Sequence, residues 1–205
     1  MAINPYRAAF TTGGLFLQEA NFIVQTYFEV NDWGTVREIV IQHNLLKTRT
    51  RASSIRTSRE IIQRLETLTR TQLQILNDGN RQEQNQILWL AVCKQYRLIQ
   101  EFAVEVIREK IYRLDTGLSY ADFDAFFNTK AEWHVELANL TLRTRSELRR
   151  VLFQMLRQAE ILSSANQILP ALPAPRVARA ILADDPAWSM VFPVSDTDVN
   201  RQAAL

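Results

Sequence analysis

The sequence has little of what cross-links or punctuates a protein chain. Its single cysteine, Cys93, cannot form an internal disulfide, which fits a reducing compartment. Cys93 ends the apolar run ILWLAVC, where we expect a buried and unreactive thiol. Only 5 glycines and 6 prolines occur in 205 residues, and most of the prolines fall in 170–193. The long segments without Gly or Pro favour helices.

Long hydrophobic runs are also missing. The longest uninterrupted apolar run, 87–93, has about a third of the roughly 20 residues that a membrane helix needs. Residues 1–14 lack the basic stretch followed by an apolar run that marks a signal peptide. We therefore expect a soluble cytoplasmic protein with no membrane segment. Because 47% of its residues are hydrophobic, the chain can form a core.

Catalytic and metal-binding patterns are absent from the sequence as well. Neither histidine, His43 or His134, has a cysteine or carboxylate at ligand spacing, so we expect each at a helix end or flank. There is no nucleophile elbow, Walker motif or dinucleotide-binding motif. We predict a protein without enzymatic activity, metal or cofactor.

What the sequence does contain is segregated positive charge. The net charge is only +2, yet residues 47–70 hold seven Lys/Arg against two acids, and residues 143–157 hold five Arg against one acid. The other 166 residues hold 12 cations and 19 acids. Local positive charge in an otherwise acidic chain favours a polyanionic partner.

Hydrophobic periodicity predicts an all-α protein, a compact helical bundle of two lobes, 1–117 and 118–205. We expect helices over about 15–30, 33–42, 53–68, 71–76, 80–115 (one long helix or two stacked ones), from Ser119, over 131–139, 144–161 and 176–183. The apolar pairs Ile161-Leu162 and Ile168-Leu169 predict a small β-hairpin. The polar tail from Ser195 is expected to fray.

Two segments have the order of a helix-turn-helix, a short helix followed by a link and a basic-faced helix. The first comprises 32–42, a linker through Arg51, and a helix capped by Ser53 or Ser54; its link is longer than the usual turn of about three to four residues. The second comprises 131–139 and a helix that begins with a Thr144/Glu147 capping box. Because the predicted hairpin follows it, this second element resembles a winged helix.

The basic and hydroxyl residues of these links and first turns are candidates for binding nucleic acid. Arg, Lys, Ser and Thr bind phosphate oxygens, Arg can also bind guanine, and a helix N-terminus adds backbone donors. In the first element the candidates are Lys47, Arg49, Arg51, Ser53, Ser54, Arg56, Thr57 and Arg59. In the second they are Arg143, Arg145, Ser146, Arg149 and Arg150. The alternative, that each segment is only a solvated helix face without a ligand, stays open at this point.

Three segments of the chain resemble one protein family. They are FTTGGLFLQEA (10–20), DWGTVREIVIQHNLLKTRTRASSIRTSREIIQRLETL (32–68), and LRRVLFQMLRQAEIL (148–162) with DDPAW after it. The similarity is to the BrxA component of bacteriophage exclusion (BREX) defence systems. It implies an all-helical, non-enzymatic component that binds double-stranded DNA through helix-turn-helix-like elements. It also implies action beside a DNA methyltransferase, ATPases and other BREX components.

Two alternatives to duplex DNA stay open. The family is also similar to NusB-type antitermination factors, which implies RNA as a ligand. However, RNA readers offer exposed aromatic residues, and none but Phe153 interleaves with the basic segments. A protein-only adaptor would instead place these segments on acidic partner surfaces. We favour phosphate-dominated binding of duplex DNA by a monomer, with no expectation about base specificity.

If both basic segments bind duplex DNA, affinity should fall by roughly 10³–10⁵-fold between about 50 and 200 mM salt, because about 6–10 counterions are displaced. A gel-shift series measures this fall. Joint replacement of Arg49, Arg51, Arg56 and Arg59 by Ala should weaken binding. Unchanged affinity in that variant would exclude the first segment as a DNA-binding site.

Overall fold

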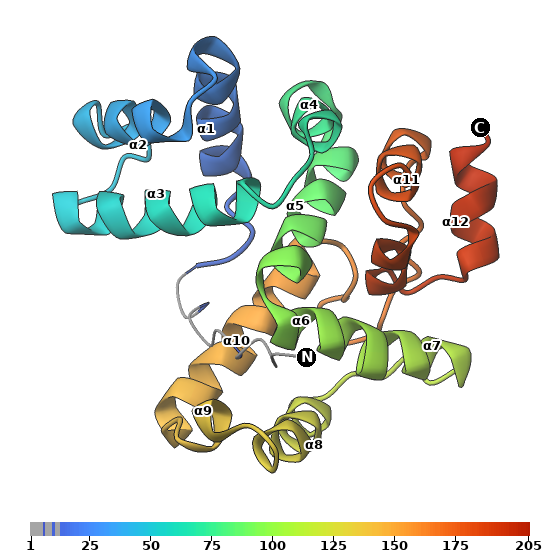
Figure 1. Cartoon of the computed structure of the whole chain (residues 1–205). Coiled ribbons are helices and arrows are strands. Elements are labelled where there is room, and N and C mark those ends of the chain that lie inside the picture. Colours follow the sequence, from blue (N-terminus) through green and yellow to red (C-terminus); the bar gives the residue numbers. More distant parts are fainter. Residues whose placement is uncertain (1–5, 7–9, 11–12) are drawn as a thin grey trace.

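The computed structural model describes residues 6, 10 and 13–205 and is built from helices (Figure 1). They are α1 (Leu17–Val30), α2 (Trp33–Gln42), α3 (Arg51–Leu65), α4 (Arg70–Asp78), α5 (Arg81–Gln95), α6 (Arg97–Phe102), α7 (Glu109–Tyr112), α8 (Tyr120–Ala131), α9 (Val135–Ala138), α10 (Leu142–Gln158), α11 (Pro175–Leu182) and α12 (Asp196–Ala203). A π-helical segment, Ala103–Arg108, joins α6 to α7, and a 3₁₀ helix, Pro186–Val191, precedes α12. The all-α prediction is confirmed.

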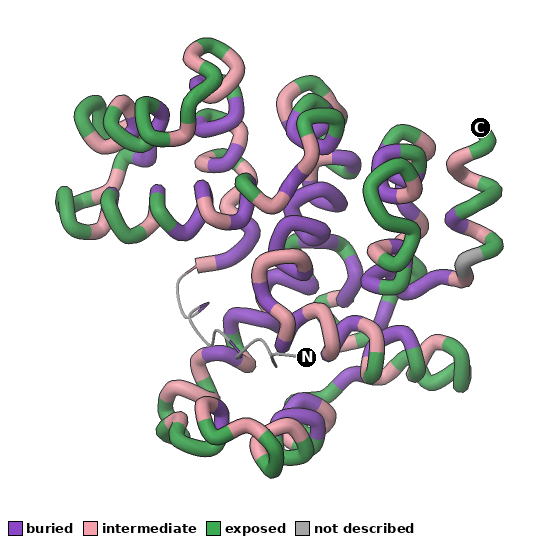
Figure 2. Tube along the Cα trace, in the orientation of Figure 1, coloured by how far each residue is buried: buried purple, intermediate pink, exposed green. Residues whose placement is uncertain are grey.

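Helix α5 lies at the centre of the molecule. It contacts α1, α3 and α4 as well as α10 and α11, and Figure 2 shows most of its length buried. Trp89 is fully buried, and its Nε1 donates a hydrogen bond to the Val191 carbonyl at 3.0 Å. A helix that is covered on all sides carries apolar residues all round, which explains the run at 87–93. Cys93 is buried in this run, as predicted, and burial raises the pKa of its thiol.

The stretch predicted as one long helix or two stacked helices forms α5 and, after a break, a second helical run made of α6, the π-helical segment and α7. Tyr96 breaks it, because its extended backbone (φ −120°, ψ 99°) separates α5 from α6. Helices α6 and α7 then run across the end of α5 (Figure 1). Phe102 of α6 packs edge-on against Phe123 and Phe126, with ring centroids 5.8 and 5.3 Å apart. These aromatic contacts hold α8 against α6.

A buried ion pair ties α3 to the centre of the molecule. Arg64 is 2% exposed; its Nε donates to Glu60 Oε1 at 2.8 Å and its Nη1 to the Gly14 carbonyl at 2.7 Å. The Tyr96 hydroxyl donates to the same Glu60 oxygen. The Arg64 guanidinium also lies over the rings of Phe16 and Tyr96. Arg64 therefore belongs to the core, although the sequence counts it among the cations of 47–70.

Several predicted helix ends are confirmed. Asp32 caps α2, because its Oδ1 accepts a hydrogen bond from Thr35 N at 2.7 Å. Hydrogen bonding to Thr35 lowers the pKa of the Asp32 carboxyl. Ser119 and Asp122 form a capping box at the start of α8. His43 is the C-cap residue of α2 and His134 the N-cap residue of α9, so both histidines lie at helix ends as predicted.

The hairpin predicted at 161–169 is not present in the described part of the chain. Leu162 and Ile168 form one isolated antiparallel bridge, and Gly117 forms another with Gln167, without any strand. Ile161, Leu162 and Ile168 are all buried. Three of the four apolar side chains thus pack into the core from a loop, whereas Leu169 is 38% exposed. The winged-helix resemblance loses the feature on which it rested.

The tail predicted to fray forms α12. Ser195 Oγ accepts a hydrogen bond from Asp198 N at 3.2 Å and caps the helix. Val199 is 1% exposed in a helix that packs against α11. One buried apolar residue and a cap are enough to hold a helix whose other positions are mostly polar.

The buried apolar residues form one cluster that extends across residue 117, so the division into 1–117 and 118–205 stays a prediction. Within the described ranges, no helix is long and apolar enough to cross a membrane.

We expect Arg64→Met to lower the free energy of unfolding by about 3–5 kcal/mol, because it leaves Glu60 as an unpaired buried charge. The double variant Glu60→Gln/Arg64→Met should lose less, since neither charge then remains. Arg59→Met, an exposed change on the same helix, should stay within about 0.5 kcal/mol of the wild type. Urea denaturation followed by circular dichroism measures all three; equal losses for Arg64→Met and Arg59→Met would contradict this role.

Candidate nucleic-acid interface

The first predicted element is built from α2, α3 and a hydrogen-bonded link between them. Helix α3 contacts both α1 and α2 (Figure 1). In the link, Asn44 and Lys47 adopt left-handed backbone conformations (φ 46° and 49°), and Lys47 N donates to the Asn44 carbonyl at 2.8 Å. The Asn44 side chain also holds Thr48, accepting from its N at 3.0 Å and donating to its carbonyl at 3.1 Å. This long link is therefore a folded turn, and Asn suits it because its short side chain bonds the local backbone.

Helix α3 begins earlier than the sequence predicts. Thr50 caps it, since its Oγ1 accepts a hydrogen bond from Ser53 N at 3.1 Å, and the cap predicted at Ser53 or Ser54 is wrong. Both serines lie inside the first two turns, and Ser54 is 2% exposed. Arg51 consequently starts the helix and does not lie on the linker. The sequence TRTRASS offers several hydroxyl residues at cap spacing, and only packing selects one.

The five candidate cations of the first element are available to a ligand. All five are exposed, and none of their side chains forms a hydrogen bond or ion pair with another residue that the structure describes: Lys47, Arg49, Arg51, Arg56 and Arg59. Ser53 and Thr57 are half-buried between them. Figure 2 shows exposed positions along the link and the outer turns of α3. We call these five cations the α3 basic face. The buried Ser54 does not belong to it.

The second segment is largely neutralised by neighbouring acids. Arg145 Nη2 lies 3.2 Å from Asp124 Oδ1 on α8, and Arg149 pairs with the other oxygen of the same carboxylate. Arg150 Nη2 lies 2.6 Å from Glu147 Oε1, and this hydrogen bond lowers the pKa of Glu147. The structure therefore brings three of the predicted cations against acids of the same chain.

The start of α10 also differs from the prediction. Thr141 is the N-cap residue, and its Oγ1 accepts a hydrogen bond from Thr144 N at 3.1 Å. Thr144 is thus the third residue of the helix, and Glu147 binds Arg150, so the predicted Thr144/Glu147 capping box is wrong. Arg143 and Ser146 are exposed on the first turns.

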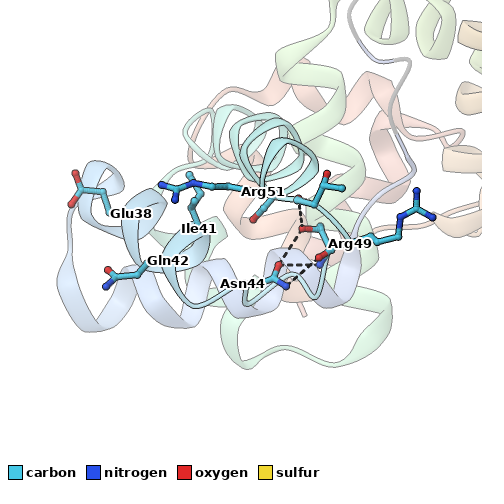
Figure 3. Close-up of a pocket in the computed structure, with 9 residues that line it drawn as sticks. Glu38, Ile41, Gln42, Asn44, Arg49 and Arg51 are labelled. Atoms are coloured by element: carbon cyan, nitrogen blue, oxygen red, sulfur yellow. Dashed lines mark hydrogen bonds between the residues drawn. The ribbon is translucent and has the colours of Figure 1, made fainter.

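A hollow of about 610 Å³ lies between α2 and the start of α3 (Figure 3). Helix α2 contributes Glu38, Ile41 and Gln42, and the other side includes Arg49, Arg51 and Ser54. In Figure 3, Arg51 extends toward α2, whereas Arg49 extends the opposite way. The sequence did not single out the α2 residues, because a helical pattern identifies the buried stripe and not which polar residues border a hollow.

Among the residues that the structure describes, no group of three or more His, Cys, Asp or Glu side chains lies close enough together to hold a metal ion.

Together, the fold and this surface define an all-helical protein with an exposed basic helix face whose cations have no side-chain partner in the described part of the chain. The chain belongs to the BrxA family, whose model matches residues 4–185. The resemblance stated from the sequence is thereby confirmed.

Two curated relatives are both named BREX protein BrxA. The protein of Escherichia coli O9:H4 (strain HS) is 24% identical over 127 residues, which cover 62% of this chain and 60% of that protein. The protein of Bacillus cereus (strain H3081.97) is 26% identical over 129 residues, covering 63% of this chain and 64% of that protein. The chain thus spans less than two thirds of either relative.

The fold is shared with a solved structure, the crystal structure of an uncharacterized protein from Magnetospirillum magneticum. The TM-score is 0.80 at 20% sequence identity, over 93% of this chain and 98% of that chain. At this identity the likeness shows the fold alone.

We expect Thr50→Ala to lower the free energy of unfolding by about 1 kcal/mol, because the Ser53 N–H loses its partner at the start of α3. Ser53→Ala should change it by less than about 0.5 kcal/mol. Urea denaturation distinguishes the two, and a larger loss for Ser53→Ala would contradict Thr50 as the cap.

Proposed function

We propose that this protein binds double-stranded DNA through the α3 basic face and acts in a BREX phage-defence system. The observation that carries the DNA-binding part is that the side chains of all five cations of that face lack a partner among the described residues. A cation already held in an ion pair must leave its acid before it binds a phosphate. These five need not, so each can bind phosphate at no such cost.

The placement of the face supports the same proposal. Lys47 and Arg49 lie on the link and Arg51 at the first position of α3, so positive charge gathers where the helix N-terminus presents its free backbone N–H groups. Both features attract phosphate. Arg56 and Arg59 continue the charge along the exposed side of the helix. Helix-turn-helix proteins present this end of the second helix to DNA.

The defence part of the proposal rests on the family. The chain belongs to the BrxA family, and both curated relatives carry BREX in their names. Other BREX components, such as the methyltransferase, are the protein partners we propose on this ground.

The second basic segment takes a subordinate part in this proposal. Arg145 and Arg149 would each have to leave Asp124 before binding DNA, and Arg150 would have to leave Glu147. Arg143 and Ser146 are the exposed residues there that could add a contact without breaking an ion pair.

Duplex DNA is favoured over RNA by the composition of the segment that carries the α3 basic face. The large exposed hydrophobic side chains of the described residues include Tyr112, Tyr120 and Trp133, but no aromatic residue lies within 47–59. A basic surface without aromatic residues can hold a phosphate backbone but offers no platform on which unpaired bases stack.

An adaptor role is a second candidate function, favoured by one observation. Trp133, Val135 and Leu142 are 82%, 71% and 81% exposed, between the end of α8 and the start of α10. Large apolar side chains gathered in one short stretch are typical of protein contacts. Co-purification of the other defence components from nuclease-treated lysate, lost on Trp133→Ser, would support this role.

For duplex DNA we expect the plot of log affinity against log salt concentration to have a slope of about −4 to −5, because five cations each displace about 0.9 counterion. This is shallower than the slope expected if both basic segments bound. Replacing Arg51, Arg56 and Arg59 by Ala should bring the slope to roughly −2 and weaken binding. Fluorescence anisotropy over a salt series measures both.

The matched controls remove exposed cations elsewhere. Arg113→Ala and Arg201→Ala, whose side chains are 78% and 75% exposed, should leave the slope within about one unit of the wild type. The pair Arg145→Ala/Arg149→Ala should do the same. Equal losses for the α3 variant and these controls would show that binding depends on total charge and not on this face.

A further inference from the structure

We propose that Ile55 of α3 contacts a pyrimidine C5-methyl group in the major groove of bound DNA. Ile55 would then make the protein bind a base that carries this methyl group more tightly than the same base without it. The inference rests on the proposed binding of duplex DNA by the α3 basic face. It deepens that function, because contacts to phosphates position a protein on DNA but do not distinguish bases.

The outward side of α3 carries an apolar residue among its cations. Ala52, Ile55, Arg56 and Arg59 are spaced by three and four residues, which places them on one side of the helix, and all four are exposed. Ile55 is 44% exposed and is the one large apolar residue in 47–59. A duplex held by Arg56 and Arg59 would therefore also meet Ile55.

The packing of α3 leaves this side open. The helix contacts α1, α2 and α5, and its inner positions Ser58, Ile61 and Ile62 are at most 2% exposed. Figure 1 shows the first turns of α3 at the outer edge of the molecule. Ile55 lies one turn into the helix, at the end that helix-turn-helix proteins present to base edges.

Helix propensity does not favour isoleucine at this position. A β-branched side chain loses rotamer freedom in a helix, so Ile is a poorer helix former than Ala, Arg or Lys. A single exposed hydrophobic residue is ordinary on most of a protein surface. Ile55, however, lies among the cations that we propose to be covered by DNA, and removing its exposed part from water on binding is favourable.

The chemistry of isoleucine specifies what it can recognise. Its side chain neither donates nor accepts a hydrogen bond, so it cannot read the donors and acceptors of base edges. The apolar group that the major groove presents is the C5 methyl of thymine. A 5-methylcytosine carries the same group at the same ring position. We therefore assign Ile55 to the methyl group itself, and the two bases that can supply it are separated by experiment.

The experiment uses three labelled duplexes of one mixed sequence. The first contains thymine, the second has uracil in place of every thymine, and the third has uracil together with 5-methylcytosine in place of every cytosine. Replacing thymine by uracil removes the methyl group and keeps the hydrogen-bonding pattern of the base pair. Fluorescence anisotropy measures the affinity for each duplex and its dependence on salt concentration.

We expect the wild type to bind the thymine duplex about fourfold more tightly than the uracil duplex, which is the gain from burying one methyl group. Ile55→Ala should bring this ratio to about one, whereas Ile55→Val, which keeps two methyl groups on the side chain, should retain a preference. The salt slope of Ile55→Ala should equal that of the wild type, because no cation is removed.

The matched control is Leu114→Ala, which truncates a side chain that is 91% exposed and lies outside α3. It should keep the full preference for thymine. Tight binding of the third duplex would show that 5-methylcytosine also supplies the methyl group. Affinity for the third duplex equal to that for the uracil duplex would identify thymine as the base that Ile55 contacts.

Equal affinity of the wild type for the thymine and uracil duplexes would overturn the methyl contact and leave DNA binding in place. A preference that survives in Ile55→Ala, or that is lost in Leu114→Ala as well, would overturn its assignment to Ile55. Failure to bind any of the three duplexes would overturn both this inference and the proposed function.

Discussion

The placement of α3 depends on one buried charge. Arg64 donates to Glu60 and to the Gly14 carbonyl, and Tyr96, at the break between α5 and α6, donates to the same carboxylate. A charge inside a protein is tolerated only when its partners are in place, so α3 has one orientation in which this cluster is satisfied. Because these residues occupy the inner side of the helix, Arg56 and Arg59 face solvent. The buried cluster of Arg64, Glu60 and Tyr96 thus determines which cations of α3 are exposed to solvent.

The two basic segments look alike in composition and differ in the folded protein. Each has several arginines on a helix that follows a short one. In the first, the acid on the same helix, Glu60, binds the buried Arg64 and leaves the exposed cations unpaired. In the second, Asp124 of α8 binds both Arg145 and Arg149. Cationic side chains are therefore available to a ligand only where the fold leaves them without an acidic partner.

Much of the fold could be predicted, because helix periodicity and caps are local. The all-helical class, most helices, the burial of Cys93 and the helix starts at residue 33 and near Ser119 follow from neighbouring residues. The predicted helix cap was wrong at α3, where several residues could serve as the N-cap. Thr50, Ser53 and Ser54 can each cap a helix, and the burial of Ser54 decides among them. The prediction was also wrong where an apolar pair could join a hairpin or a core, as at Leu162 and Ile168.

By itself, the sequence determined the helical class, the family and the positions of the basic segments along the chain. Only the tertiary structure decided which cations are paired. Arg145 and Arg149 lie 21 and 25 residues from Asp124, a separation at which contact depends on how α8 and α10 pack. The hollow beside α3 was decided in the same way, since Glu38 and Ser54 border it only once α2 and α3 are folded together. Periodicity specifies which side of each helix is buried, whereas ion pairs and hollows arise between helices.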